Sequence, residues 1–360
     1  MRILLVNAKP SLIEALKSQP GVDPVGLWPR KHDFPHLLDA TNAKALYYSG
    51  GKKLSPAAAW QMRKAIRNLR PDVIHAFYGR ALAHVALATT GMHGRPRIVS
   101  FRGITPPLAP LNAGDWITYR HPNVDAHACE SNAVRESMIL SGVPAERCWT
   151  TYNSMYFQPL RRPGREGLAQ FGIPANAFVV GTMAAMRPVK RIDLLLQAAT
   201  QLADLGDLYW VLFGQVLDPA IKRLAADPRI RDRVRLVGFR TDASELISGA
   251  NLFVMPSRAE ALCQALLEAM HQGVCPVVSD AGGMKEVVRH GRDGLVVPAE
   301  SASALAAAIR SLHADRPQSL RFAVSAAQRI ADDFTPARMA ERTLAIYSNL
   351  LNSEPSHCAA

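Results

Sequence analysis

The stretch LFVMPSRAEALCQALLEAMHQGVCPVVSD, residues 252–280, places a segment of helical periodicity between two short apolar runs. From Leu262 to Met270 the apolar residues recur at the spacing of an amphipathic helix that packs one face on a core. The flanking runs LFVM and CPVV are apolar on both faces, as the strands of a covered parallel sheet are. The stretch therefore predicts a strand-helix-strand unit.

The same segment contains two carboxylates, Glu260 and Glu268, spaced eight residues apart. Glu268 falls on the face opposite the apolar residues, where a solvated surface carboxylate is the usual outcome. The pair alone therefore does not identify a site, and the neighbouring loops have to be considered with it.

The alternation of strands and helices continues on both sides of this unit. From about residue 176 onward the expected strands are FVVGTM (178–183), YWVLFG (209–214), VRLVGF (234–239), LFVMPS (252–257), CPVVSD (275–280) and GLVVP (294–298). Amphipathic segments separate these runs, which predicts a doubly wound α/β domain with a parallel sheet.

The first half shows the same alternation less clearly. Its expected strands are RILLVN (2–7), PDVIHAFY (71–78), RIVSF (97–101), DAHACE (125–130) and WTTYN (149–153), with helices near 11–18, 57–70, 80–90 and 132–142. The Pro-, Gly- and Arg-rich segment FQPLRRPGREG (157–167) has the composition of a linker. We therefore expect Rossmann-like domains over 1–160 and 161–335 that face each other across a cleft, with a last helix over 336–351.

Length and composition limit the class of protein. With 360 residues, 48% hydrophobic and 20% charged, the chain is expected to be globular with two domains. No apolar run reaches the roughly 18 residues of a membrane span, and the run in MRILLVNAKP is too short for a signal peptide, so a cytoplasmic protein is expected. The five cysteines show no C-x-x-C spacing, which argues against a disulfide framework or a zinc site.

The net charge of +12 is unevenly distributed, because residues 1–160 hold 19 Lys and Arg against 10 Asp and Glu, a balance of +9. Such a field attracts nucleic acid, acidic lipid, or a phosphorylated or acidic substrate. The segment AWQMRKAIRNLR (59–70) mixes Trp60 and other apolar residues with four cations, as a surface helix that faces an anionic membrane or acceptor does. An ordinary core-facing helix with a solvated basic side remains the alternative.

The loops that follow the strands of the second half carry polar and glycine residues. In open parallel sheets the ligand binds beyond the carboxyl ends of the strands. The loops there are expected to be MRPVKR (186–191), GQVLD (214–218), GFRTD (238–242), PSRAEALCQ (256–264) and DAGGMKE (280–286). We therefore expect one rim that gathers cations, glycines and Glu260.

These residue types suit a nucleotide diphosphate that carries a sugar. Arg187 and Lys190 would neutralise the diphosphate, although each alone could be a solvated loop cation. A helix start would add the backbone N–H groups of Leu262, Cys263 and Gln264. Glu260 could accept hydrogen bonds from sugar hydroxyls. If the intervening residues were mostly helical, Glu268 would lie about 12 Å further along the axis.

Three stretches together resemble a known family: GTMAAMRPVKRIDLLLQAA (181–199), RVRLVGFRTDASELISGANLFVMPSRAEALCQALLEAMHQGVCPVVSDAGGMKEVV (233–288) and GRDGLVVP (291–298). They look like the nucleotide-sugar-binding domain of retaining glycosyltransferases of family 4, which have the GT-B fold and an E-x7-E motif. The resemblance covers roughly residues 178–298.

The resemblance implies a role for individual positions. It places Glu260 near the donor-sugar hydroxyls, Glu268 on the ribose, Lys190 on the diphosphate, and Gly238 and Phe239 beside the base. Gly214 is assigned to the donor site in the same way. The resemblance further implies a last helix that packs back on the N-terminal domain, retention of configuration by front-side displacement, and no need of a metal or other cofactor.

The chain departs from the family pattern in four places. Ala185 stands where many members have an arginine, and Arg187 is expected to replace that charge because extended backbone returns to the same face after two residues. The boundary reads NSMY (153–156), and VNAKP (6–10) lacks the expected glycine pair. Arg102 stands where members often carry a histidine, so we assign it to the acceptor side.

The expected function is therefore sugar transfer from a nucleotide-sugar donor to an anionic or lipid-linked glycan acceptor, in surface polysaccharide or lipopolysaccharide assembly. The protein would be cytoplasmic, with an anionic membrane surface as a further partner. A GT-B homologue that binds without transfer remains an alternative. A dinucleotide-dependent oxidoreductase is disfavoured because no G-x-G-x-x-G follows a strand. A nucleic-acid partner is not expected, because charge is its only support.

Overall fold

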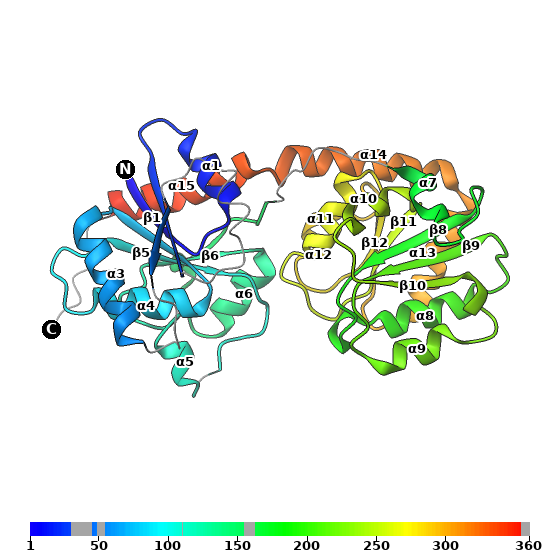
Figure 1. The fold of residues 1–360 in the computed structure, drawn as a ribbon, viewed down its shortest axis with the longest axis horizontal. Coiled ribbons are helices and arrows are strands. Elements are labelled where there is room, and N and C mark those ends of the chain that lie inside the picture. Colours follow the sequence, from blue (N-terminus) through cyan, green and yellow to red (C-terminus); the bar gives the residue numbers. More distant parts are fainter. Residues whose placement is uncertain (30–44, 49–54, 110, 155–162, 354–360) are drawn as a thin grey trace. The chain divides into compact units, whose positions relative to one another are not determined.

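The computed structural model describes residues 1–29, 45–48, 55–109, 111–154 and 163–353. The chain divides into two compact units, each drawn in Figure 1. Unit 1 consists of Met1–Tyr156 with Pro336–Ala360, and unit 2 of Phe157–Thr335. The domain boundary expected at residue 160 lies among residues 155–162, outside the described residues.

Unit 1 contains a seven-stranded sheet of order β3-β2-β1-β4-β5-β6-β7 in which every pair is parallel. Its elements are β1 (Arg2–Val6), α1 (Pro10–Lys17), β2 (Asp23–Pro29), β3 (Ala45–Tyr48), α3 (Pro56–Leu69), β4 (Val73–Phe77), α4 (Gly79–Thr89), β5 (Arg97–Arg102), α5 (Ala113–Trp116), β6 (Ala126–Cys129), α6 (Asn132–Leu140), β7 (Cys148–Thr150) and α15 (Pro336–Asn352). The two strands β2 and β3 were not expected from the sequence.

The sheet of unit 1 is covered on both faces. Helices α1 and α15 pack on one face together with Trp28, and helices α3 and α4 pack on the other. The last helix is therefore part of the unit 1 core. Its Tyr347 is fully buried, and the hydroxyl lies 2.7 Å from Nδ1 of the equally buried His75 on β4.

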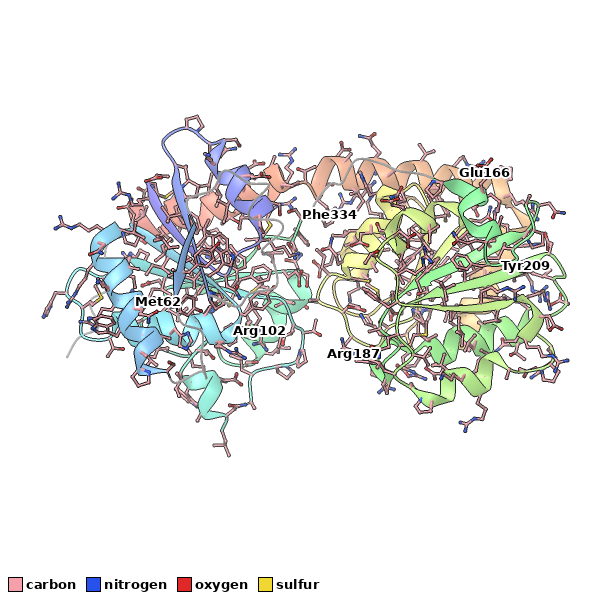
Figure 2. The ribbon with its side chains drawn as sticks, viewed as in Figure 1. Met62, Arg102, Glu166, Arg187, Tyr209 and Phe334 are labelled. Carbon is pink, nitrogen blue, oxygen red and sulfur yellow. The ribbon has the colours of Figure 1, made fainter. Side chains whose placement is uncertain are left out.

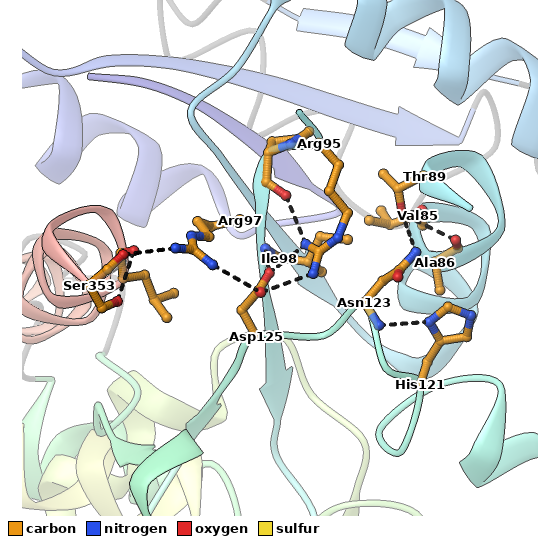
Figure 3. A network of polar contacts seen from close by, with 12 residues as sticks. Val85, Ala86, Thr89, Arg95, Arg97, Ile98, His121, Asn123, Asp125 and Ser353 are labelled. Atoms are coloured by element: carbon orange, nitrogen blue, oxygen red, sulfur yellow. Dashed lines mark hydrogen bonds and ion pairs between the residues drawn. The ribbon is translucent and has the colours of Figure 1, made fainter. Parts of the chain in front are cut away.

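Besides the contact of Tyr347 with His75, a polar network at the start of β5 binds the residue that follows α15 (Figure 3). The guanidinium of Arg95 donates to both oxygens of Asp125 at 2.7 and 3.1 Å, and the N–H of Ile98 donates to the same carboxylate at 2.7 Å. Arg97 also faces Asp125 and donates to the carbonyl of Ser353 at 2.9 Å. Residues 256 positions apart are thereby joined.

Unit 2 contains a six-stranded parallel sheet of order β10-β9-β8-β11-β12-β13. Its elements are α7 (Gly164–Ala169), β8 (Phe178–Met183), α8 (Ile192–Gln201), β9 (Leu208–Phe213), α9 (Pro219–Ala225), β10 (Val234–Gly238), α10 (Ala243–Leu246), β11 (Leu252–Met255), α11 (Gln264–His271), β12 (Cys275–Ser279), α12 (Met284–Val287), β13 (Leu295–Val297), α13 (Ala302–Ala314) and α14 (Arg316–Asp333). All six strands match the sequence prediction to within a few residues.

The core of unit 2 lies between its sheet and the helices of each face. Apolar side chains of α8, α9 and α13 pack against alternate residues of β8, β9 and β11, while α7, α10 and α11 lie on the other side of the sheet (Figure 1). Both units thus have the doubly wound α/β architecture that the sequence predicts. Within the described part of the chain, none of the helices combines the length and apolar character needed to cross a membrane.

Candidate active site

The candidate site of unit 2 lies where the strand order reverses. Strands β8 and β11 are neighbours, but the chain leaves β8 toward β9 on one side and leaves β11 toward β12 on the other. Such a switch point leaves a crevice at the carboxyl edge of a parallel sheet, and ligands bind there. The loop after β8 contains Arg187 and Lys190, and the loop after β11 contains Glu260. The tertiary structure therefore brings the predicted cations and the first carboxylate to the same edge.

Lys190 and Glu260 form an ion pair across this switch point. Nζ of Lys190 donates to Oε1 of Glu260 at 2.5 Å, and the carboxylate side chain is only 11% exposed. Oε1 also accepts a hydrogen bond of 2.8 Å from Oγ of the buried Ser257, whose carbonyl in turn accepts one of 2.6 Å from Ser279. Among the described residues, both of these side-chain contacts of the carboxylate are made by Oε1.

The glycine pair after β12 packs on the backbone of the carboxylate loop. The N–H of Gly283 donates to the carbonyl of Glu260 at 3.1 Å. Gly282 has a φ of +58°, and a Cβ at this position would lie 1.9 Å from the same carbonyl oxygen. Only glycine fits this backbone conformation and this close approach. The two glycines therefore hold the backbone of the Glu260 loop in place. The sequence alone suggests only that glycines here let the chain pass close to a ligand or make a tight turn.

The helix that follows Glu260 starts later than the sequence suggests. Helix α11 begins at Gln264, with Cys263 as N-cap at a φ of +74° and Leu262 before it. Half of the spacing between the two glutamates is therefore not helical, so the length of about 12 Å expected for a helical segment does not apply. Burial raises the pKa of the Cys263 thiol.

The first turn of α11 nevertheless offers free donors. Backbone bonds within the described residues begin with the N–H of Leu266, which donates to the carbonyl of Cys263 at 3.0 Å. The N–H groups of Cys263 and Gln264 have no backbone acceptor there, and they lie at the positive end of an eight-residue helix. Glu268 is half-buried in the second turn of the same helix.

Two further loops of the rim are joined by their glycines. The N–H of Gly214 donates to the carbonyl of Gly238 at 2.7 Å, so the loops after β9 and β10 lie side by side. Gly214 has a φ of +124°, and a Cβ there would lie 1.8 Å from the carbonyl oxygen of Ala184 after β8. Phe239, the next residue after Gly238, is exposed. Gly214 and Gly238, which the resemblance assigns to the donor site, therefore lie beside the loop that contains Arg187 and Lys190.

Arg187 lies exposed on the loop after β8, and Figure 2 labels it there. It forms no ion pair with another described residue. The N–H of Arg187 donates to the carbonyl of Ala185 at 2.7 Å, Met186 between them forms a parallel β-bridge with Val216, and Arg187 itself has extended backbone angles. That Arg187 replaces the charge missing at Ala185 stays a prediction.

A network that the sequence analysis missed joins the two loops of the switch point. Arg258 of the β11 loop donates through its backbone N–H to the carbonyl of Val189 at 2.9 Å, and its guanidinium lies 2.9 Å from Glu300. Glu300 also pairs with Arg191, which itself binds Asp193. These contacts fix the backbone on either side of Lys190. No local sequence pattern indicates these contacts, because the residues that they join are up to 109 positions apart in the chain.

In unit 1, the predicted acceptor-side residue Arg102 is buried at the end of β5. Its guanidinium donates to the carbonyl of Pro106 at 2.5 Å and lies 4.7 Å from the ring centre of Tyr119. Arg102 therefore holds the loop after β5. A role toward an acceptor remains a prediction, and it would act through this loop.

The carboxyl edge of unit 1 contains polar features that the sequence analysis did not single out. Asn7 after β1 and Tyr78 after β4 both have positive φ, at the point where the strand order of this sheet reverses. A positive φ is costly for Tyr78 and tolerated more easily by asparagine, and such conformations concentrate at functional sites. A carboxylate, Glu130, follows β6, and the amide of the buried Asn153 donates to it at 2.8 Å.

Comparisons with known proteins agree with this arrangement. Residues 25–155 match the family model Glycosyltransferase Family 4, and residues 165–329 match the model of glycosyl transferases group 1. A GDP-mannose-dependent alpha-mannosyltransferase of Mycobacterium tuberculosis is 26% identical over 66% of this chain and 63% of its own length. A lipopolysaccharide core biosynthesis glycosyltransferase, LpsE of Rhizobium meliloti, is 28% identical over 52% of this chain and 53% of its own.

A solved structure has the same fold over nearly the whole chain. The structure of Anabaena Alr3699/HepE in complex with UDP superposes with a TM-score of 0.79 at 21% identity, covering 97% of this chain and 100% of the other. The two sheets and the two domain matches show the GT-B fold.

Proposed function

We propose that this chain, which contains the N-terminal and C-terminal domains of a GT-B glycosyltransferase, transfers a hexose from a nucleotide-sugar donor to a glycan acceptor. One observation carries the proposal. The ion pair of Lys190 and Glu260 spans the switch point of unit 2, next to the free N–H groups that start α11. Cation, helix start and carboxylate are the groups that a diphosphate linked to a sugar would need.

The geometry supports an exchange of partners when the donor binds. A diphosphate offers Lys190 two negative charges, and charge-assisted hydrogen bonds to phosphate are strong. If Lys190 moves to the phosphate, Glu260 keeps its bond to Ser257 and becomes available to a sugar hydroxyl. Arg187 and the first turn of α11 then stabilise the departing nucleoside diphosphate, as preorganised charges do. Glu268 would bind the ribose, and Gly214, Gly238 and Phe239 would flank the base.

We further propose that transfer proceeds with retention of configuration and without a metal. The positive groups of the rim would do for the leaving diphosphate what a divalent ion does in other transferases. The acceptor is proposed to be an anionic or lipid-linked glycan of surface polysaccharide or lipopolysaccharide assembly. The LpsE relative, named for lipopolysaccharide core biosynthesis, and the positive charge of residues 1–160 support this part.

A thermal-shift panel of UDP-, GDP- and ADP-sugars tests the proposal. One class of donor should raise the melting temperature of the full chain, because a ligand that binds only the folded state stabilises it. Glu268→Gln should weaken this shift, whereas Glu166→Gln, on an exposed residue of α7, should leave it unchanged. EDTA should change neither the shift nor turnover. No stabilisation by any donor contradicts the proposal, and stabilisation without turnover of donor favours the alternative of a binding homologue.

A further inference from the structure

Three residues of unit 2 that are not glycine have left-handed backbone, and all three lie at the carboxyl edge of its sheet. Among the described residues of this unit they are Arg191, with a φ of +51°, Cys263 at +74° and Glu300 at +61°. Each one comes shortly before a helix that follows a strand, respectively α8, α11 and α13. Left-handed backbone is costly for residues with a side chain, and it concentrates at functional sites. The backbone strain of unit 2 is therefore gathered at the edge that carries the candidate site.

Two of these strained residues, Arg191 and Glu300, form an ion pair with each other. Arg191 also binds Asp193, whose two oxygens accept from its guanidinium at 3.1 and 3.0 Å. Glu300 also binds the guanidinium of Arg258 through both oxygens, at 2.9 and 3.2 Å. We call Arg191, Glu300 and Arg258 the arginine–carboxylate clamp. The clamp joins the loops that follow β8, β13 and β11.

The clamp is linked through the chain to the pair of Lys190 and Glu260. Arg191 follows Lys190 directly, and Arg258 lies two residues before Glu260. The backbone bond of 2.9 Å from Arg258 to the carbonyl of Val189 joins the same two loops. A change in how the two arginines are held therefore reaches both members of the pair.

The loop that carries Glu300 is anchored independently of its side chain. The N–H of Ala299 donates to the carboxylate of Asp280 after β12 at 2.8 Å, and the N–H of Asp280 donates to the carbonyl of Val297 at 2.9 Å. The loop after β12 is also the one whose glycines support the backbone of Glu260. Glu300 therefore holds the two arginines from a loop that is already fixed to the site.

Exposed ion pairs alone do not account for the strained backbone. The side chains of Arg258 and Glu300 are 62% and 42% exposed, and ion pairs at such positions add little to the free energy of unfolding. Of the three side chains only that of Arg191 is largely shielded, at 15% exposed. Left-handed backbone at two residues lowers the free energy of unfolding, and it is typical of sites that need a preorganised geometry. The clamp therefore serves position more than stability.

We propose that Glu300 is a positioning residue of the donor site, which acts through Arg191 and Arg258 on the pair of Lys190 and Glu260. By holding one arginine on each loop, it keeps the amine and the carboxylate within contact of each other across the switch point. Its effect on donor affinity rests on the proposed function, whereas its effect on Lys190 does not.

Competitive labelling of lysines with an amine-reactive reagent, read by mass spectrometry, measures the state of Lys190 without any donor. An ammonium engaged by a carboxylate reacts more slowly than a free one, because the neutral amine is the nucleophile. Glu300→Gln should raise the labelling rate of Lys190 roughly threefold or more. The exposed Lys222 and Lys285 of unit 2 should react as they do in the parent chain.

Donor kinetics supply the second measurement. Glu300→Gln should raise the KM for the nucleotide-sugar about tenfold and change kcat less, because Lys190 is proposed to bind the diphosphate before as well as during transfer. The double variant R191G/E300G removes the clamp together with both strained conformations, since glycine adopts left-handed backbone readily. It should therefore melt close to the parent chain and still show the raised KM. A clamp that serves stability alone would give a lower melting temperature and an unchanged KM.

Asp204→Asn is the matched control. Asp204 binds Arg310 through two bonds of 2.7 and 2.8 Å, and it lies before β9, at the amino edge of the same sheet. This variant should leave both the labelling of Lys190 and the KM unchanged. Unchanged labelling of Lys190 in Glu300→Gln overturns the proposal, and so does an unchanged KM for the donor. If the parent chain binds no nucleotide-sugar, the proposed function fails, while faster labelling of Lys190 in Glu300→Gln still supports the action of Glu300 on Lys190.

Discussion

At the scale of single residues, the contacts of the Glu260 carboxylate are the basis of the proposed chemistry. One oxygen of its carboxylate is held by Lys190 and Ser257, and both partners come from the edge of the same sheet. A carboxylate held in this way is preorganised, since its position is fixed before a sugar arrives. Ser257 is buried and bonded to Ser279, so it acts as a positioning residue.

Substitutions of these two residues should differ in size. Glu260→Gln should lower kcat/KM for sugar transfer by roughly 10²–10³, because it removes a charge that acts on the transition state. Ser257→Ala should lower it by about tenfold, as the loss of one hydrogen bond does. Steady-state kinetics with the donor found in the thermal-shift panel measures both. Equal rates for Glu260→Gln and the parent chain would exclude the proposed role.

At the scale of elements, the loops after β11 and β12 are packed against each other through their backbones. Gly282 and Gly283 contact the carbonyl of Glu260, while Arg258 binds the loop after β8. Loops held by backbone contacts of this kind keep a site in place without help from a ligand. The helix start at Gln264 depends on Cys263 in a left-handed conformation, which is unusual for a residue with a side chain.

Two glycine substitutions separate backbone strain from the effect of the close contact. Gly282→Ala should reduce stability by roughly 3 kcal/mol or more and abolish the donor-induced thermal shift, because its Cβ would displace the Glu260 backbone. Gly291→Ala, at a φ of +73° with open space around it, should cost only about 1–2 kcal/mol and keep the shift. Urea unfolding and the donor panel measure the two quantities. A full donor shift in Gly282→Ala would show that the loop contact is not needed.

At the scale of the whole molecule, each unit is a complete doubly wound domain, and the end of the chain belongs to the first. Helix α15 fills the core opposite α3 and α4, and its buried contacts include the pair of Tyr347 and His75. Buried histidines also lie on β6, where Nδ1 of His127 is 2.7 Å from Oγ of Ser100. These rings are kept neutral by their surroundings.

The buried histidines should make unit 1 sensitive to acid. Burial lowers the pKa of His75 and of His127 from 6.5 to about 3. Between these values the unfolded chain binds protons that the folded chain does not, so stability is complete above about pH 6.5 and falls as the pH is lowered toward about 3. Each histidine adds a slope of up to about 1.4 kcal/mol per pH unit.

Urea unfolding of the full chain between pH 7.5 and 5 measures this slope, before most carboxylates titrate. His127→Asn should reduce it by roughly a third to a half, because His75 and the partly buried His121, whose pKa burial also lowers, contribute the rest. The exposed His93→Gln should leave it unchanged. A stability of unit 1 that stays constant over this range would contradict the expected protonation of the unfolded chain.

Most strands of unit 2 could be predicted because they are continuous apolar runs in a sheet covered on both faces; the edge strand β10, which contains Arg235, is the exception. Strand β2 could not, since DPVGLWP contains two prolines and a glycine, residues that usually interrupt strands. Strand β2 lies between β1 and β3 because it pairs with both, for example Arg2 with Asp23 and Gly26 with Ala45. The buried ring of Trp28 also holds it, through a hydrogen bond of 3.1 Å from the indole N–H to the carbonyl of Ala8.

The sequence by itself determined the fold class of both units and the residue types of the candidate site, because periodicity and loop composition are local properties. Only the tertiary structure decided that Lys190 binds Glu260 across the switch point, that Gly282 supports the carboxylate loop, and that α15 completes unit 1. It also showed Glu130 beside Asn153 at the carboxyl edge of unit 1. These contacts join residues tens to hundreds of positions apart, and their geometry depends on how strands order themselves in a sheet, which no local pattern encodes.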